Sequence, residues 1–136
     1  MGFIVFVVLL ISGLSGATAE PQQTPNSVMV VYYFHRTIRC PSCILLEELT
    51  REALESGFEK ELNVGSIRFA VINVDKKGNE HFVSDYHLNA QSVIVSEIHS
   101  GKEKRWKNLD QVWALLEDEG RLLEYIQKEI KEYLKD

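Results

Sequence analysis

Residues 32–43 read YYFHRTIRCPSC and contain both cysteines of the 136-residue chain, Cys40 and Cys43. An apolar run ends inside this stretch, and a run with helical spacing follows it. A C-x-x-C pair can be a redox dithiol, half of a metal site or two buried thiols. Its place between a predicted strand and a predicted helix favours the redox dithiol.

The segments on either side of the cysteines predict that strand and that helix. Residues 27–34 (SVMVVYYF) form a continuous apolar run, typical of a strand that is buried on both faces. Apolar residues recur at helical spacing between Pro41 and Ser56, and proline is tolerated in a first helical turn. We therefore expect a helix that begins at the cysteine pair.

The rest of the chain predicts three more strands and three more helices. Strands are expected at 67–74 (IRFAVINV), 92–98 (SVIVSEI) and 103–107, the last two joined by a hairpin turn at Ser100-Gly101. A short helix should follow Gly78, with Asn79 as its N-cap. The expected inward residues of that helix are Phe82, Val83 and Tyr86.

The C-terminal segment predicts two helices. Asn108 is expected to cap the first, whose apolar stripe is Leu109, Val112, Trp113 and Leu116. Gly120 is expected to separate it from, or bend it into, a helix that reaches the C-terminus. A right-handed crossover makes the first two strands parallel, and the hairpin makes the last two antiparallel. The predicted fold is therefore α/β, with a central mixed four-stranded sheet, flanking helices and an extended C-terminal helix.

Composition limits the classes of function. The chain is long enough for one domain, and 45% of its residues are hydrophobic, enough for a real core. The formal net charge is −5, and no basic cluster exceeds a pair such as Lys76-Lys77. The positive patch of a nucleic-acid-binding protein is therefore missing from the sequence.

The N-terminus is typical of an export signal. Residues 1–19 carry no charged side chain, and their apolar run is followed by Ala17-Thr18-Ala19, an A-x-A cleavage pattern. Without cleavage, the same segment would be an N-terminal anchor that contacts the membrane. Residues 20–26 (EPQQTPN) have the composition of a linker, so the domain is expected at 27–136. The predicted location is extracytoplasmic: periplasmic, secreted or membrane-tethered.

The two cysteines are expected to have different roles. A helix N-terminus favours a thiolate, so Cys40 is the candidate attacking thiol. Cys43 lies about one turn deeper and is the candidate resolving thiol. His35, Arg36 and Arg39 would lower the pKa of Cys40 further if their side chains turn toward it; Arg36 and Arg39 are equally well read as solvated loop charges.

Two other uses of the cysteine pair compete with redox exchange. A structural disulfide at this spacing closes too short a loop to restrict the unfolded chain much. Two thiolates also suit Cu(I) or Zn²⁺, but a single C-x-x-C pair is weak evidence for a metal site, and the spacing of the four histidines matches no metal motif. No metal ligands are therefore assigned.

Several segments resemble the thioredoxin superfamily. They are YYFH at 32–35, RCPSC at 39–43, NVD at 73–75 and Tyr86. With NEHF at 79–82, SDY at 84–86, SVIVSE at 92–97 and GKEKRWKNLDQVW at 101–113, the chain more closely resembles the exported thioredoxin-like proteins described as nitrophenyl-compound nitroreductase subunits (ArsF-type). The resemblance implies a thioredoxin-like fold and a redox-active dithiol.

Three positions depart from the thioredoxin pattern. Phe34 stands where thioredoxins have a buried aspartate that assists proton transfer, and Arg39 stands where they have a tryptophan. Ser92 falls at the position of the cis-proline that faces the dithiol. A cis bond before a residue other than proline costs about 3 kcal/mol, which favours a trans peptide at Gln91–Ser92. Ser92 is expected to contact the site, with capping of the following strand as the alternative.

The leading functional hypothesis is a thiol-disulfide oxidoreductase that exchanges electrons with protein partners through Cys40 and Cys43. Either direction of electron flow fits the motif. No Gly-rich dinucleotide fingerprint or flavin site is recognisable, so no cofactor is expected, and any nitro reduction needs a cofactor-bearing reductase subunit as partner. The alternatives are a soft-metal module and a redox subunit of a larger complex. In such a complex Trp106 and Trp113 would be anchors, although packing is the simpler interpretation.

Overall fold

The structure, a computed structural model, describes residues 26–135. The predicted leader 1–19 and nearly all of the predicted linker lie outside the described residues. Within residues 26–135, none of the helices is long and apolar enough to cross a membrane.

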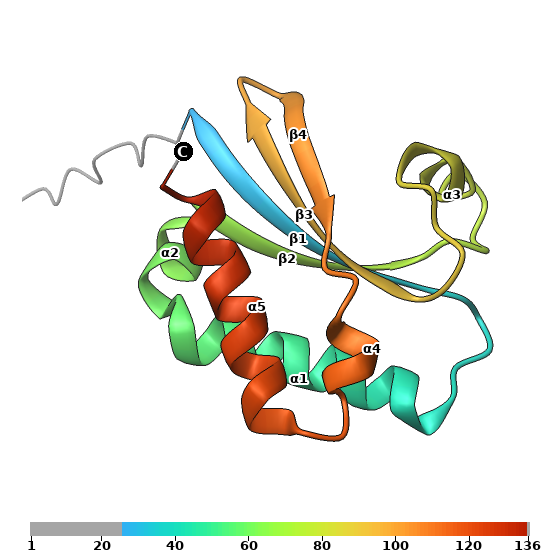
Figure 1. Cartoon of the computed structure of the whole chain (residues 1–136). Helices are drawn as coiled ribbons and strands as arrows, with labels where there is room; N and C mark the ends of the chain where they lie inside the picture. Colours follow the sequence, from blue (N-terminus) through green and yellow to red (C-terminus); the bar gives the residue numbers. More distant parts are fainter. Residues whose placement is uncertain (1–25, 136) are drawn as a thin grey trace, which may run out of the picture.

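A four-stranded mixed sheet forms the centre of the fold (Figure 1). The strands are β1 (Ser27–His35), β2 (Ile67–Asn73), β3 (Ser92–His99) and β4 (Lys102–Asn108). Their order in the sheet is β2-β1-β3-β4. β1 pairs in parallel with β2 and antiparallel with β3, and β3 pairs antiparallel with β4. The prediction of a mixed sheet with a parallel pair and a terminal hairpin is confirmed.

The helices are α1 (Pro41–Gly57), α2 (Glu59–Val64), α3 (His81–Asp85), α4 (Val112–Leu115) and α5 (Glu119–Tyr133). Figure 1 shows α1 and α5 side by side against one face of the sheet. They pack through buried residues such as Leu46, Ala53 and Ile126. The Gln127 amide also donates to the Ala53 carbonyl of α1 at 3.0 Å.

Both faces of β1 are covered, which explains why its sequence is apolar at successive positions. Val31 and Tyr33 belong to the core under α1 and α5. Phe34 belongs to a second cluster with Tyr86 of the α3 segment. β4 is an edge strand rich in charged side chains, a composition that discourages pairing with another chain.

The hairpin between β3 and β4 turns at the predicted residues. Ser100 and Gly101 both have positive φ, 48° and 77°. Two successive residues with positive φ make the turn whose twist matches a two-residue hairpin. Local turn chemistry therefore predicted this connection correctly.

The helical segment after residue 57 differs from the prediction. Phe58 leaves helical geometry, with φ −142° and ψ 34°, and its buried ring fills the core beside α1. The chain then resumes as α2, which the sequence pattern did not predict. Only Leu62 and Val64 are apolar within α2, so it carries no amphipathic stripe that a periodicity search would find.

Three predicted helix boundaries were also wrong. The N-cap of α3 is Glu80, and the amide of Asn79 instead donates to the carbonyl of Asn73. Asn108 ends β4 rather than capping a helix, and only the four residues of α4 are helical before residue 116. Gly120 lies in the first turn of α5, whose N-cap is Asp118. The Asn79 amide has a long-range partner at Asn73, Asn108 continues the pairing of β4 with β3, and Asp118 accepts from the Arg121 N–H in place of a break at Gly120.

Candidate active site

The two cysteines lie where the chain passes from β1 into α1. Cys40 is the N-cap of α1, in extended conformation, and Pro41 begins the helix. The sulfurs of Cys40 and Cys43 form a disulfide, with the Cα atoms 5.1 Å apart. Cys40 is exposed, whereas Cys43 is only 5% exposed. A partner can therefore reach the Cys40 sulfur far more easily than the Cys43 sulfur.

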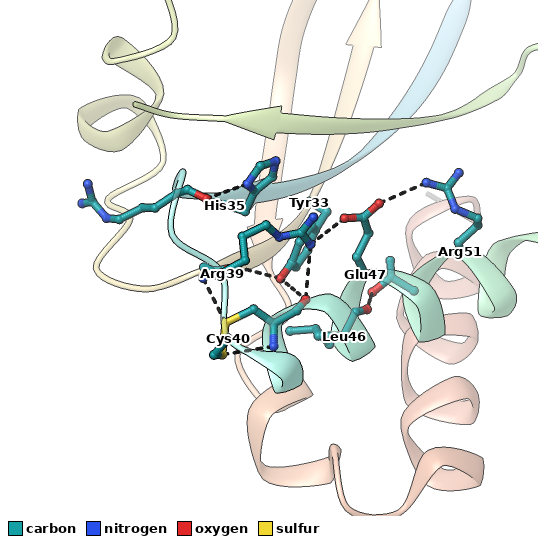
Figure 2. A network of polar contacts seen from close by, with 11 residues as sticks. Tyr33, His35, Arg39, Cys40, Leu46, Glu47 and Arg51 are labelled. Atoms are coloured by element: carbon teal, nitrogen blue, oxygen red, sulfur yellow. Dashed lines mark hydrogen bonds and ion pairs between the residues drawn. A yellow bond between two sulfur atoms is a disulfide. The ribbon is translucent and has the colours of Figure 1, made fainter. Parts of the chain in front are cut away.

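The start of α1 favours negative charge on Cys40. The backbone N–H of Cys43 donates to Sγ of Cys40 at 3.2 Å (Figure 2). The other unpaired N–H groups of a helix N-terminus and the helix dipole act in the same direction. After reduction, these groups would stabilise a Cys40 thiolate. The geometry suits an attacking thiol at Cys40 and a resolving thiol at Cys43.

The loop before Cys40 is held by the end of β2 and the residues after it. Asp75 accepts hydrogen bonds from the backbone N–H of Thr37 at 2.8 Å and from Nη1 of Arg36 at 3.0 Å. The amide of Asn73 donates to the Thr37 hydroxyl at 3.1 Å. The Thr37 N–H and then the Arg36 charge hold the pKa of Asp75 below its ordinary value. Arg36 therefore binds Asp75, a loop anchor that sequence reasoning missed.

We expect Asp75→Ala to loosen this loop. The Thr37 amide should exchange with solvent about tenfold faster or more, because its acceptor is gone. The depressed pKa of Asp75 also gives the folded chain stability that is fully present above the unfolded value of about 3.9 and is lost as pH falls through the folded value. Site-resolved hydrogen exchange and acid unfolding of both chains measure the two effects.

Asp85→Ala is the matched control for that substitution. Asp85 is also an exposed carboxylate, paired with His81 on α3 rather than with the loop. It should leave the exchange of Thr37 unchanged. Equal Thr37 protection in the Asp75→Ala chain would contradict the anchoring role.

Arg39 lies against the side of α1. Its Nη2 donates to Oε2 of Glu47 at 2.6 Å and approaches the carbonyl oxygen of Cys43 at 3.5 Å. Its guanidinium lies 5.6 Å from the centroid of the Tyr33 ring. Burial alone would lower the pKa of Arg39, but Glu47 and Tyr33 raise it. Figure 2 shows this network, which also includes Arg51. The charge of Arg39 is thus directed to Glu47 rather than to the Cys40 sulfur.

His35 is half-buried at the end of β1. Its Nδ1 donates to the carbonyl oxygen of Arg36 at 2.8 Å, since a carbonyl can only accept. Its ring stacks near Tyr33, with centroids 6.2 Å apart. Phe34 points to the opposite face and is 1% exposed. The side chains of His35 and Phe34 therefore lie on opposite faces of β1, and His35 does not substitute for a side chain at position 34.

Ser92 begins β3 and is buried. Its hydroxyl donates to the carbonyl oxygen of Ala90 at 2.9 Å, which is the local capping contact. The Gln91–Ser92 peptide is trans, because residues 26–135 contain no cis peptide bond. The neighbouring Gln91, which sequence reasoning did not single out, reaches the site instead: its Nε2 donates to Sγ of Cys43 at 3.0 Å.

Large apolar side chains are exposed next to the cysteine pair in the sequence and at the residue that binds the Gln91 carbonyl. Ile38 is 88% exposed just before the pair, and Ile44 is 44% exposed just after it. Trp113 is 37% exposed, and its indole N–H donates to the carbonyl of Gln91 at 2.8 Å. These three are most of the large apolar side chains that the described part of the chain exposes. Trp106, by contrast, packs edge-on against Tyr86.

Metal ligands do not gather in the described part of the chain. Among residues 26–135, no group of three or more His, Cys, Asp and Glu side chains could hold a metal ion. The cysteine pair is joined as a disulfide.

Comparison with known proteins returned structures only. No family profile matches the chain, and no curated protein matches it. Thioredoxin from Fasciola hepatica is 22% identical, with 74% of this chain and 80% of that chain covered and a TM-score of 0.42. Thioredoxin from Trypanosoma brucei brucei is 19% identical, with 76% of each chain covered and a TM-score of 0.42. Oxidized thioredoxin O2 from Arabidopsis thaliana is 15% identical, with 66% and 73% covered and a TM-score of 0.41.

The fold follows from the chain's own topology. The strand order is β2-β1-β3-β4, with one parallel pair, and α1 connects the two parallel strands. The C-x-x-C disulfide lies at the start of that helix. The chain has a thioredoxin-like fold with a dithiol at the N-terminus of α1.

Proposed function

We propose that this chain is a thiol-disulfide oxidoreductase that exchanges electrons with protein partners through Cys40 and Cys43. One observation carries the proposal: an exposed sulfur at the N-cap of α1 is bonded to a buried sulfur one turn later. A disulfide with one accessible sulfur can be opened by an incoming thiolate. The charge of that broken bond falls on Cys43, and the helix N-terminus stabilises the Cys40 thiolate once Cys40 is released from the mixed disulfide.

The exchange takes two steps in the reducing direction. The Cys40 thiolate attacks a partner disulfide, forms a mixed disulfide and releases the first partner thiolate. The Cys43 thiolate then attacks Sγ of Cys40, which breaks the mixed disulfide and releases the second partner thiolate. Two electrons pass to the partner, and the chain ends with the Cys40–Cys43 disulfide. The reverse sequence oxidises a partner dithiol.

The surroundings of the disulfide support a protein as partner. Ile38 and Ile44, neighbours of the cysteine pair in the sequence, and Trp113, which binds the Gln91 carbonyl, expose apolar surface. Exposed apolar groups near a reactive atom are typical of surfaces that bind another chain. We infer that the partner presents its cysteine within an apolar segment.

We further propose an extracytoplasmic location and a partner class. The apolar, uncharged residues 1–19 and the Ala17-Thr18-Ala19 pattern support export, and disulfide chemistry suits oxidising compartments. The resemblance to nitrophenyl-compound nitroreductase subunits supports a cofactor-bearing reductase among the partners. In that arrangement the cofactor would belong to the partner, and this chain would carry electrons.

The test is a redox titration of the full chain in glutathione buffers. Free thiols are alkylated at each buffer redox potential, and the mass of the intact chain is measured. We expect the chain to change between zero and two alkyl groups within the range of redox enzymes, about −270 to −120 mV. The same mass spectrum of the chain from its native source gives its first residue, with Glu20 expected after cleavage.

A structural disulfide would behave differently in that titration. Such bonds have potentials below about −300 mV and resist the glutathione pool. A pair that stays oxidised throughout would overturn the proposal. Cys40→Ser supplies the control, because its single thiol should take one alkyl group under reducing conditions.

A further inference from the structure

The side-chain amide of Gln91 lies between a tyrosine and the buried sulfur of the dithiol. Its Nε2 donates to Sγ of Cys43 at 3.0 Å. Its Oε1 accepts from the hydroxyl of Tyr33 at 3.0 Å. The same hydroxyl also donates to the carbonyl oxygen of Cys43 at 2.6 Å, so its one proton is shared between the two acceptors. Gln91 and Tyr33 therefore contact Cys43 from two directions.

The amide is held in position by both of its neighbours. The indole of Trp113 donates to the backbone carbonyl of Gln91 at 2.8 Å, which holds the loop. Tyr33 is fully buried in β1, and burial raises the pKa of its hydroxyl, so it remains a donor at neutral pH. Because Oε1 of Gln91 faces the Tyr33 hydroxyl, the N–H groups of its Nε2 face the sulfur of Cys43. Groups placed in advance cost little reorganisation during reaction.

We propose that Gln91 is a third catalytic residue, whose amide N–H stabilises the thiolate of Cys43 while the disulfide opens and closes. This inference rests on the proposed exchange function. It names the residue that acts on the buried sulfur, whereas the N-terminus of α1 acts on the exposed one.

Charge develops on Cys43 in both directions of exchange. When a partner thiolate attacks Sγ of Cys40, the Cys40–Cys43 bond breaks and its electron pair leaves on Sγ of Cys43. When a mixed disulfide resolves, the proton of Cys43 must go to solvent before its thiolate attacks Sγ of Cys40. Hydrogen bonding to the charged form favours that form. The amide of Gln91 is directed at the atom that bears this charge.

An uncharged amide suits the surroundings of Cys43 better than a carboxylate would. The Ser92 hydroxyl is bound to Ala90, and Phe34 packs on the face of β1 opposite Tyr33. A carboxylate beside Cys43 would oppose a thiolate, whereas an amide N–H supports it. Gln91 thus stabilises the thiolate without adding charge to a buried site.

The test follows Cys43 directly in the full chain. Reduced protein is mixed with an excess of an aromatic disulfide whose released thiolate is coloured. Cys40 attacks first and releases one thiolate; Cys43 then attacks Sγ of Cys40 and releases the second. The rate of the second phase follows the thiolate fraction of Cys43, so its pH profile gives the pKa of Cys43.

Gln91→Leu should shift that profile rather than lower it. Loss of a hydrogen bond to a charged group is expected to raise the pKa of Cys43 by about one unit. A more basic thiolate is also a better nucleophile. The second phase should therefore be about threefold slower well below the midpoint and about threefold faster well above it, given a Brønsted coefficient near 0.45. The first phase should change by less than about twofold, since Cys40 keeps its own donors.

Gln127→Leu is the matched control. Gln127 is also a partly buried glutamine whose amide donates to α1, but to Ala53 and Ser56, away from the dithiol. This variant should leave both phases at the wild-type pH profile. Gln91→Glu is a second test variant, because glutamate has the same shape as glutamine but carries a carboxylate in place of the amide. Its carboxylate should raise the pKa of Cys43 at least as far as the leucine variant does.

The outcomes separate this inference from the proposed function. A wild-type chain with no second phase would refute the exchange function itself. A wild type with two phases and a Gln91→Leu profile that coincides with it would overturn the role of Gln91 alone. Uniform slowing of the second phase at every pH would also overturn it, because that result assigns Gln91 to holding the loop.

Discussion

Cys40→Ser is expected to lower the rate of disulfide exchange by about a thousandfold or more, because a hydroxyl is not ionised at neutral pH and cannot attack a disulfide. Cys40 is the exposed sulfur of the pair, and the chain has no cysteine besides Cys40 and Cys43. The measurement is the reduction of a protein disulfide by the reduced chain. Circular dichroism of the variant checks that the fold is intact.

Cys43→Ser is the matched variant and should fail at a different step. Its Cys40 still attacks, but nothing resolves the mixed disulfide, so the covalent adduct with the partner should accumulate and be visible by mass. Both variants should fold, because a bond between residues three apart restricts the unfolded chain little. An adduct on the Cys40→Ser chain, carried by Cys43, would reverse the assigned roles.

Phe34→Asp is expected to destabilise the fold by about 4 kcal/mol or more, which is a large part of the stability of a small domain. Phe34 is 1% exposed, and its ring centroid lies 5.1 Å from that of Phe82 and 5.3 Å from that of Tyr86. The introduced carboxyl would lose this aromatic packing and meet apolar neighbours. Urea unfolding measures the loss.

The penalty of Phe34→Asp should grow with pH. Burial raises the pKa of the introduced carboxyl above its unfolded value of about 3.9, so the folded chain holds the proton more tightly. Stability should therefore fall as pH rises from about 4 toward the folded pKa. Phe34→Leu, the control, keeps an apolar side chain and should cost about 1.5 kcal/mol or less at every pH. A small, pH-independent loss for the aspartate variant would show that water or a polar partner reaches this position.

The succession of strands and helices along the chain and the position of the cysteine pair could be predicted because both depend on neighbours in the sequence. A strand buried on both faces reads as an apolar run, and β1 was recognised in that way. The turn at Ser100 and Gly101 was recognised because a two-residue hairpin needs positive φ. Pro41 after Cys40 marked the first turn of α1 in the same local manner.

Helix caps were less predictable because their donors and acceptors have competing partners. Asn79 has the chemistry of an N-cap, yet its amide is used by the carbonyl of Asn73 at the end of β2. For Arg36 and Arg39 the sequence leaves two alternatives, a charge turned toward Cys40 or a solvated loop charge. Each instead has a carboxylate partner, Asp75 for the first and Glu47 for the second. Sequence spacing does not state which of several acceptors a long side chain will choose.

The sequence was sufficient to place an exposed cysteine at a helix start and a second cysteine one turn later. The surroundings of the buried sulfur depend on the pairing of β1 with β3, which sets Phe34 opposite Ser92 and so brings the preceding Gln91 to the end of the sheet beside the dithiol. Gln91 is 48 residues from Cys43 and 58 from Tyr33, yet it hydrogen-bonds both. Hydrophobic periodicity reports which face of a strand is buried but not the register between distant strands. The group that acts on Cys43 therefore became identifiable only when the sheet was assembled.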